Sequence, residues 1–187
     1  MKKKIYLLGL LLMVFENGAA NCANDPYFGD QWGLKNTGQS GGTSGIDIKA
    51  CEAWQISTGK NITVAVVDMG IYFTHPDLAA NEHPLSFDCE RGTSPQVIYS
   101  SSNTPNNAPN RGTRRAGIIG AVKNNIIGIA GVAPDCKLMS ISTSLLESAR
   151  PNIYAEIARG INWAWQNGVE IGGTFKANVE PYVICPP

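Results

Sequence analysis

The feature that most constrains the fold is a nearly continuous apolar run over residues 61–67, which ends directly at Asp68. The run is rich in β-branched side chains and shows no alternation of apolar and polar residues. This pattern is typical of a strand that is buried on both faces of a parallel sheet. We therefore expect Asp68 at the carboxyl end of a central strand.

The rest of the chain alternates between helical and strand patterns. We expect a helix over 112–122, a strand over 137–142, a helix over 151–167 that Gly168 stops, and a third strand that starts at 169–171. This order predicts an α/β fold with a parallel sheet and right-handed crossovers. In the second helix, the apolar side chains that recur every four residues are expected in the core: Ile153, Ile157, Ile161 and Trp165.

The remaining segments are short or irregular in pattern. Asp47 is expected to cap a short helix from Ile48 to Ile56, and the Gly- and Ser-rich stretch 33–45 reads as a surface loop. Residues 79–110 are rich in Pro, Ser and Asn, and residues 172–187 lose both periodicities. We expect irregular structure in both.

Composition bounds the class of protein. A chain of 187 residues with 43% apolar content is long enough for one domain with a sizeable core. Lys+Arg 15 balance Asp+Glu 15, so the net charge gives no indication of a nucleic-acid partner or an acidic membrane surface. Arg111, Arg114 and Arg115 form a local basic cluster, for which a solvated face is a better reading than nucleic-acid binding.

The first 23 residues have the layout of a secretory signal peptide. Three lysines precede an apolar stretch over 5–15, and small residues follow at 18–20. The apolar stretch is too short to span a bilayer, so we expect export to the cell envelope or medium without a stable membrane anchor. Ala20 and Ala23 are both candidate cleavage points.

The chain has five cysteines, and none forms a closely spaced pair of the kind that binds zinc or performs dithiol chemistry. Partly buried free thiols are the favoured interpretation, although an exported chain could oxidise some of them. The spacing does not settle any pairing. The cysteines are Cys22, Cys51, Cys89, Cys136 and Cys185.

Motifs over residues 24–171 resemble the amino-terminal half of the catalytic domain of subtilisin-like serine proteases. They are Asn-Asp-Pro-Tyr-Phe at 24–28 with Gln-Trp-Gly-Leu at 31–34, Val-Asp-Met-Gly-Ile at 67–71 with His-Pro-Asp-Leu at 75–78, Arg-Gly-Thr at 111–113 with Ala-Gly-Ile-Ile-Gly-Ala at 116–121, and the loop at 124–134. The resemblance implies an incomplete three-layer subtilisin-like α/β fold. It divides the chain into a leader (1–23), a partial peptidase domain (24–171) and a divergent tail (172–187).

The resemblance also implies hydrolysis of polypeptide substrates by Ser, His and Asp acyl transfer, with Asp68 as the orienting acid and Arg111 in the place of the base. An arginine has no acceptor lone pair and keeps its proton near neutral pH, so it cannot act as a general base. His75 and His83 are expected in structural turns and do not replace it. The family's oxyanion asparagine and Gly-Thr-Ser-Met-Ala nucleophile motif do not occur in these residues, so we expect an inactive chain that is shortened at both ends.

A calcium site is the second implication of the resemblance. In relatives with an Asn-Asn-x-x-Gly-Ile loop, two aspartates, an asparagine and backbone carbonyls hold the ion. The matching side chains are Asp25, Asp77 and Asn125, and the matching carbonyls are those of Val122, Ile127 and Ile129. All are hard oxygen donors, as Ca²⁺ requires. The alternative is that Asp77 and Asn125 only cap turns.

Charge in the helix after position 111 predicts a marginal fold. Arg111 can form a bidentate bridge with Asp68, whereas Arg114 and Arg115 have no evident acidic partner, and an unpaired buried charge costs several kcal/mol.

The sequence leaves three hypotheses for the function: an inactive protease product, a secreted pseudoenzyme that binds peptide or calcium, and an unrelated α/β domain for nucleotides. The absence of a Gly-x-Gly-x-x-Gly loop counts against the third. Substrate preference and oligomeric state stay undetermined.

Overall fold

A computed structural model describes residues 22–99, 110–144, 151–169, 171–176 and 179–184. Residues 1–21 of the expected leader (1–23) lie outside the described residues, as do part of the irregular stretch 79–110 and Cys185. In this part of the chain, no helix is both long and apolar enough to cross a bilayer.

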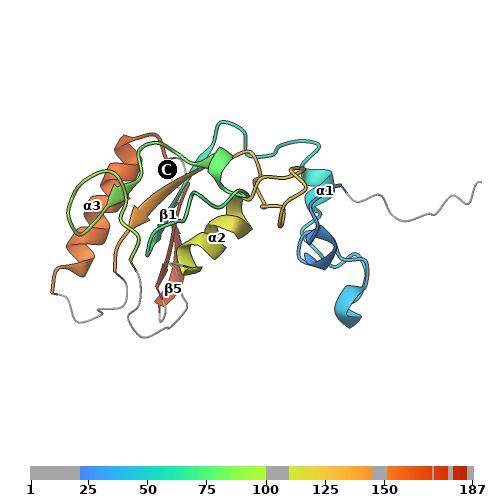
Figure 1. Ribbon diagram of the computed structural model, residues 1–187. Helices are drawn as coiled ribbons and strands as arrows, with labels where there is room; N and C mark the ends of the chain where they lie inside the picture. Colours follow the sequence, from blue (N-terminus) through green and yellow to red (C-terminus); the bar gives the residue numbers. More distant parts are fainter. Residues whose placement is uncertain (1–21, 100–109, 145–150, 170, 177–178, 185–187) are drawn as a thin grey trace, which may run out of the picture.

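A five-stranded sheet in the order β2-β3-β1-β4-β5 forms the centre of the fold (Figure 1). Neighbouring strands run parallel except for β4 and β5, which pair antiparallel. The expected parallel α/β fold is confirmed, as are the central strand and the strand over 137–142. The strands are β1 (Thr63–Asp68), β2 (Phe87–Asp88), β3 (Lys137–Ser142), β4 (Ile171–Lys176) and β5 (Val179–Ile184).

The expectation of irregular structure is wrong in two places. Phe87–Asp88 forms a short strand that pairs with β3, and residues after 171 form the β4–β5 hairpin. Pairing with a neighbouring strand supplies backbone hydrogen bonds whatever the side-chain pattern, so these strands form without a periodic sequence.

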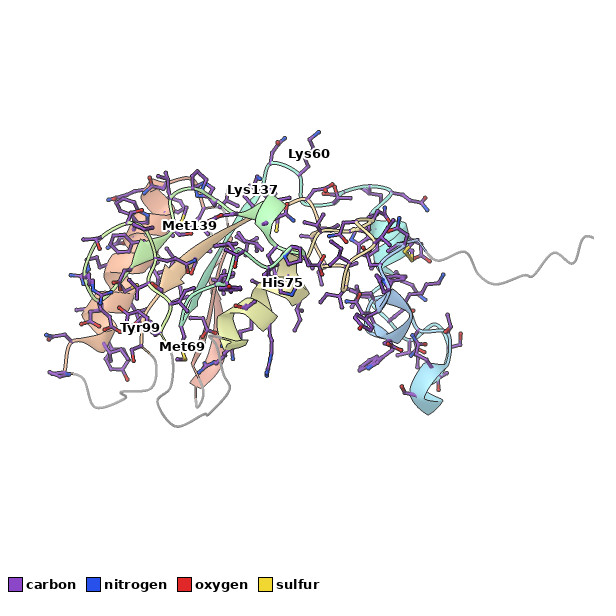
Figure 2. All side chains as sticks on the ribbon, viewed as in Figure 1. Lys60, Met69, His75, Tyr99, Lys137 and Met139 are labelled. Atoms are coloured by element: carbon purple, nitrogen blue, oxygen red, sulfur yellow. A yellow bond between two sulfur atoms is a disulfide. The ribbon has the colours of Figure 1, made fainter. Side chains whose placement is uncertain are left out.

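Helices cover both faces of the sheet, as the alternation of β1 side chains requires. Val64 and Val66 pack on the side of α2 (Asn110–Gly120), whereas Ala65 and Val67 pack on the side of α3 (Ile153–Gln166). Figure 1 shows the two helices on opposite sides of the strands. On the α3 side, Met139 of β3 lies in the same core (Figure 2). This arrangement confirms the expected three layers.

The predicted core stripe of α3 is wrong at its end. Ile153 is buried, but Trp165 is 62% exposed. A spacing of four residues advances about 400° around a helix of 3.6 residues per turn, so three such steps drift by about 120°. Gly160 faces the sheet instead, where an added Cβ would lie 2.3 Å from Cys89 Sγ.

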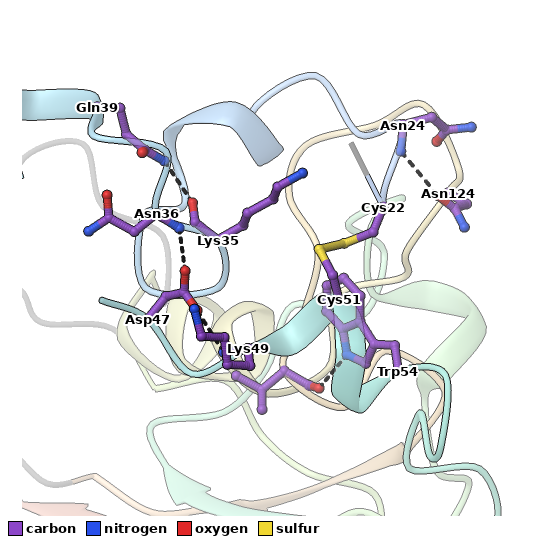
Figure 3. Close-up of a disulfide and its surroundings, with 11 residues drawn as sticks. Cys22, Asn24, Lys35, Asn36, Gln39, Asp47, Lys49, Cys51, Trp54 and Asn124 are labelled. Atoms are coloured by element: carbon purple, nitrogen blue, oxygen red, sulfur yellow. Dashed lines mark hydrogen bonds and ion pairs between the residues drawn. A yellow bond between two sulfur atoms is a disulfide. The ribbon is translucent and has the colours of Figure 1, made fainter. Parts of the chain in front are cut away.

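A separate small core holds the amino-terminal segment against α1 (Ala50–Ala53). A disulfide joins Cys22 and Cys51 (Figure 3), so the interpretation of these two as free thiols is wrong. Cys89 and Cys136 are free and buried, as expected. The core residues are Ala23, Phe28, Leu34, Ala50, Trp54 and Ala130.

The helix expected over 48–56 is only four residues long, and Asp47 does not cap it. The Asp47 carboxylate accepts from the amides of Asn36 at 2.7 Å and Lys49 at 2.8 Å, so it closes a loop rather than a helix end (Figure 3). The stretch 33–45 is exposed from Ser40 to Gly45, as predicted for a surface loop, but Leu34 belongs to the small core and Asn36 is also buried. Short 3₁₀ helices complete the fold: η1 (Phe28–Asp30), η2 (Gln39–Gly41) and η3 (Ala79–Asn81).

Candidate functional site

Asp68 lies at the carboxyl end of β1 with 0% of its surface exposed. Its Oδ1 accepts a hydrogen bond from the Met69 amide at 2.7 Å. The first turn of α2 packs directly on this strand end, because a Cβ added at Gly112 would lie 2.2 Å from the Gly70 carbonyl oxygen. Only a glycine at position 112 therefore allows α2 to approach Asp68 this closely.

Two arginines from one face of α2 converge on the other carboxylate oxygen. Arg111 Nε lies 3.6 Å from Asp68 Oδ2, and Arg115 Nη1 contacts the same oxygen more closely. Residues four apart share one face of a helix, which explains why both reach the strand end. We call Asp68, Arg111 and Arg115 the arginine–aspartate cluster.

This cluster corrects one expectation. The closer of the two ion pairs of Asp68 is that with Arg115, which had no evident acidic partner in the sequence, while Arg111 Nε lies 3.6 Å away. Arg114 is exposed to solvent. Unpaired buried arginines were the reason to expect a marginal fold, and these contacts remove that reason. The stability of the fold is still a prediction.

Two effects lower the pKa of Arg111 and one raises it. Burial lowers the pKa of its guanidinium, the charge of Asp68 raises that pKa, and the charge of Arg115 lowers it. Even a lowered arginine pKa leaves the side chain protonated near neutral pH. Position 111 therefore holds a fixed cation beside the buried carboxylate.

Both histidines accept hydrogen bonds from nearby backbone amides. His75 Nδ1 accepts from the Asp77 amide at 3.2 Å, and His83 Nδ1 accepts from the Leu85 amide at 3.2 Å. Burial and the charge of Lys137 lower the pKa of His83. These local contacts are those of turn residues, which is the role that the sequence predicted.

The three side chains predicted as calcium ligands come together beside the loop 122–132. The Asp25 carboxylate accepts from the amides of Asn124 at 3.0 Å and Asn125 at 3.2 Å. Asp77 Oδ1 accepts from Asn125 Nδ2 at 2.8 Å. Segments about 50 and 100 residues apart in sequence thus meet at one point.

The loop also brings its backbone to Asp77. The Ile129 amide donates to Asp77 Oδ2 at 3.0 Å, and the Val122 amide donates to the Asp77 carbonyl at 2.9 Å. Asn125 Oδ1 accepts from the Ile127 amide at 2.8 Å. A Cβ added at Gly128 would lie 2.3 Å from Asp77 Oδ2, so the carboxylate fills the space that glycine leaves.

The oxygen donors at this position suit a hard cation, although they do not include a group of several acidic side chains. Within the described segments, no group of three or more His, Cys, Asp or Glu side chains could hold a metal ion. A cation at this position would therefore depend on two carboxylates, one amide oxygen and backbone carbonyls. Ca²⁺ accepts such mixed oxygen sets.

An apolar cavity of about 470 Å³ adjoins this loop and α2. His75 lies on its wall beside α2 (Figure 2). Ile118 also lines the cavity and is 61% exposed. Sequence periodicity did not indicate this hollow, because its lining comes from three separate segments.

Comparison with known proteins decides the ancestry. The model of the "Subtilase family" matches residues 59–173 of this chain. The chain belongs to the subtilase family. The matched region includes Asp68, Asp77, Arg111 and Asn125, and it rules out the unrelated nucleotide-binding domain considered above.

Curated relatives include neuroendocrine convertase 2 of Homo sapiens, which is 41% identical over 128 residues, and its Drosophila melanogaster counterpart, which is 41% identical over 127. Each alignment covers 63% of this chain and 18% of the relative. The chain thus spans about a fifth of the length of these subtilases.

Solved structures agree with this assignment. The serine protease of Aeromonas sobria is 28% identical with a TM-score of 0.62, and the match covers 81% of this chain and 25% of that protein. Fervidolysin of Fervidobacterium pennivorans, a keratinolytic enzyme related to subtilisin, is 32% identical with a TM-score of 0.51 over 65% of this chain and 18% of its own. The sheet and helices described above are therefore a partial subtilase fold.

Proposed function

We propose that this chain is part of an exported subtilase-family protein that does not hydrolyse peptide bonds through Asp68. The observation that carries the proposal is the approach of Arg111 Nε to within 3.6 Å of Asp68 Oδ2. In the acyl-transfer mechanism, a buried aspartate orients a histidine that removes and returns a proton. Here the aspartate faces guanidinium groups instead.

Arginine chemistry explains the loss of catalysis. The nucleophile's proton needs an acceptor within hydrogen-bond reach, and a guanidinium offers only donors. Asp68 itself is committed to Met69 and the two arginines, so it is not available as a substitute base. Loss of the base in a triad removes several orders of magnitude in rate.

The test is a peptidase assay of the chain and of the longest product that its gene encodes. Fluorogenic peptides and a fluorophosphonate probe for activated serines should both give the signal of a buffer blank. The Asp68→Asn variant should give the same result. Turnover in the wild type that disappears in Asp68→Asn would overturn the proposal, because it would show that Asp68 still supports catalysis.

We also propose that the site of Asp25, Asp77 and Asn125 binds calcium, together with the carbonyls of Val122, Ile127 and Ile129. The Asp25 and Asp77 carboxylates both accept hydrogen bonds from Asn125, and each retains lone pairs beyond those that accept the amides. A bound Ca²⁺ would neutralise the two carboxylates and join the amino-terminal segment to the loop 122–132.

Calcium titration monitored by the unfolding temperature tests this part. Calcium should raise the unfolding temperature of the wild type, since a ligand that binds only the native state stabilises it. Asp77→Asn should abolish the shift, and Asp30→Asn should keep it, because Asp30 is exposed and lies outside the site. Equal shifts in all three proteins would contradict a site at Asp77.

Binding of a polypeptide without cleavage is a second candidate function. The apolar cavity beside Ile118 favours it, because subtilase substrates are polypeptides and apolar hollows are where ligands bind. Fluorescein-labelled casein should bind the wild type and remain intact, and Ile118→Asp should weaken that binding. Binding that is equal in Ile118→Asp would exclude this surface.

For localisation, we propose that the basic and apolar start of the chain directs export. The Cys22–Cys51 disulfide supports this proposal, because disulfides persist in oxidising compartments.

A further inference from the structure

The segment that carries Asp25 is anchored at both ends. The Cys22–Cys51 disulfide fastens its start to α1. At its other end, the side chain of Gln31 exchanges two hydrogen bonds of 2.8 Å with the backbone of Ala130. Asp25 lies between these two anchors, so its position depends on both.

On both sides of Asp25, the segment contacts the loop that supplies most of the other candidate calcium ligands. Before it, the Asn24 amide donates to Asn124 Oδ1 at 3.0 Å (Figure 3). After it, the Tyr27 amide donates to the Gly128 carbonyl at 3.0 Å. The loop therefore meets the Asp25 carboxylate on a segment whose start is held by a covalent bond.

The disulfide is the anchor that redox chemistry can open. Cys22 and Cys51 are half-buried, and together with the exposed Glu52 they line a hollow of about 410 Å³. The free thiols Cys89 and Cys136, in contrast, are 0% exposed. A thiol–disulfide exchange partner can therefore reach the anchor but not the two buried thiols.

Opening this anchor changes the cost of presenting Asp25 to a cation. In the oxidised chain, the segment is already ordered when the ion arrives. In the reduced chain, binding must also restrict the freed start of the segment, and that loss of conformational entropy weakens the affinity. Loss of a group that orients a metal ligand typically weakens metal binding about 10–100-fold.

We propose that the Cys22–Cys51 disulfide positions Asp25 for calcium, so that the site binds calcium tightly only in the oxidised protein. This inference rests on the calcium site proposed above. When the bond forms, the two thiols give up two protons and two electrons to the disulfide of an exchange partner, which becomes a dithiol. The site is thus completed in an oxidising compartment and stays weak while the chain is reduced.

Calcium titration by calorimetry of the full chain, oxidised and then reduced with dithiothreitol, tests the inference. The Kd should rise about 10–100-fold on reduction, and Cys22→Ser/Cys51→Ser should have the higher Kd under both conditions. Equal Kd values in the oxidised and reduced wild type would overturn the inference and leave the calcium site intact. No binding to the oxidised wild type would overturn the site and the inference together.

A matched variant separates positioning from a general loss of stability. Ile141 is fully buried on the α3 side of the sheet, so Ile141→Val destabilises the fold without touching the Asp25 segment. It should keep the Kd of the oxidised wild type, with circular dichroism confirming that each protein is folded during the titration. A Kd that rises as much in Ile141→Val as on reduction would contradict a positioning role.

Terbium luminescence reports on the ligands directly. Tb³⁺ takes the hard oxygen ligands that Ca²⁺ takes, and its lifetimes in H₂O and D₂O report the number of coordinated waters. Reduction should increase that number, because water replaces the Asp25 carboxylate. An unchanged number of waters would show that Asp25 stays in place and would overturn the inference.

Linkage supplies an independent measurement, because coupling between two equilibria is reciprocal. Calcium should make the disulfide harder to reduce by the same factor by which reduction weakens calcium binding, which is about 30 mV for each tenfold change. Equilibration with dithiothreitol redox buffers, in calcium and in a chelator, measures this shift. A midpoint that is the same in both would contradict the coupling.

Discussion

The guanidinium of Arg115 donates to the buried carboxylate of Asp68. Asp68 Oδ2 accepts that contact, and Arg111 Nε lies 3.6 Å from the same oxygen. The carboxylate that we propose as the counterpart of the family's orienting acid is thus held by cations from the first turns of α2.

Arg115→Met should lower the free energy of unfolding by about 1–3 kcal/mol, because it removes the closest charged partner of a fully buried carboxylate. Arg114→Met is the matched control, since Arg114 is exposed, and it should change stability by less than about 0.5 kcal/mol. Urea unfolding monitored by circular dichroism measures both. Equal effects of the two substitutions would show that the Arg115 contact does not stabilise the fold.

Gly128→Ala should destabilise the loop 122–132 and reduce any calcium-induced rise in the unfolding temperature. The new Cβ would lie 2.3 Å from Asp77 Oδ2, and the residue has a φ of +54°, which alanine adopts at a cost of about 1 kcal/mol or more. Gly29→Ala has nothing within 4 Å of its new Cβ and serves as the control. If both variants keep the wild-type response to calcium, Asp77 is not part of the site.

Removal of the disulfide should cost about 2–4 kcal/mol, because Cys22 and Cys51 close a loop with a sequence separation of 29. Dithiothreitol should therefore lower the unfolding temperature of the wild type and have no effect on the Cys22→Ser/Cys51→Ser double variant. The same response to reductant in both proteins would mean that another cysteine is responsible.

The buried thiols predict a specific dependence on pH. Burial raises the pKa of Cys89 to about 12 and that of Cys136 to about 11, from a usual value near 9.0. A thiol whose pKa is higher in the folded state contributes its full stability below about pH 9 and loses that contribution as pH rises toward 11 and 12. Native protein at pH 8.5 should accordingly resist alkylation by iodoacetamide at both cysteines. Protein unfolded in urea should be alkylated at the same two residues. Rapid alkylation of the native protein would contradict the burial of these thiols.

Some parts of this structure follow from the sequence alone. Most of the apolar run over 61–67 lies in the central strand β1, and Asp68 stands at the carboxyl end of that strand, because a continuous β-branched run has few other stable arrangements. The meeting of Asp25, Asp77 and Asn125 also followed from the family motifs. These features depend on local pattern or on shared ancestry.

Other parts could not be predicted, since they depend on contacts between distant segments. Arg115 looked unpaired because its partner Asp68 is 47 residues away and becomes a neighbour only when α2 packs on β1. The Cys22–Cys51 bond has no signature in its spacing. Trp165 was misplaced for a geometric reason, because a spacing of four residues drifts off the buried face of α3.

The most direct test of the account is the titration of an imidazole placed at position 111. In Arg111→His, nuclear magnetic resonance should show that the new histidine has a pKa that falls by about 1–2 units when Asp68→Asn is added, because the neighbouring carboxylate stabilises the charged imidazolium. That result would place the side chain at position 111 beside Asp68, where Arg111 acts as a fixed cation instead of a base. An identical histidine pKa with and without the Asp68 carboxylate would contradict the account.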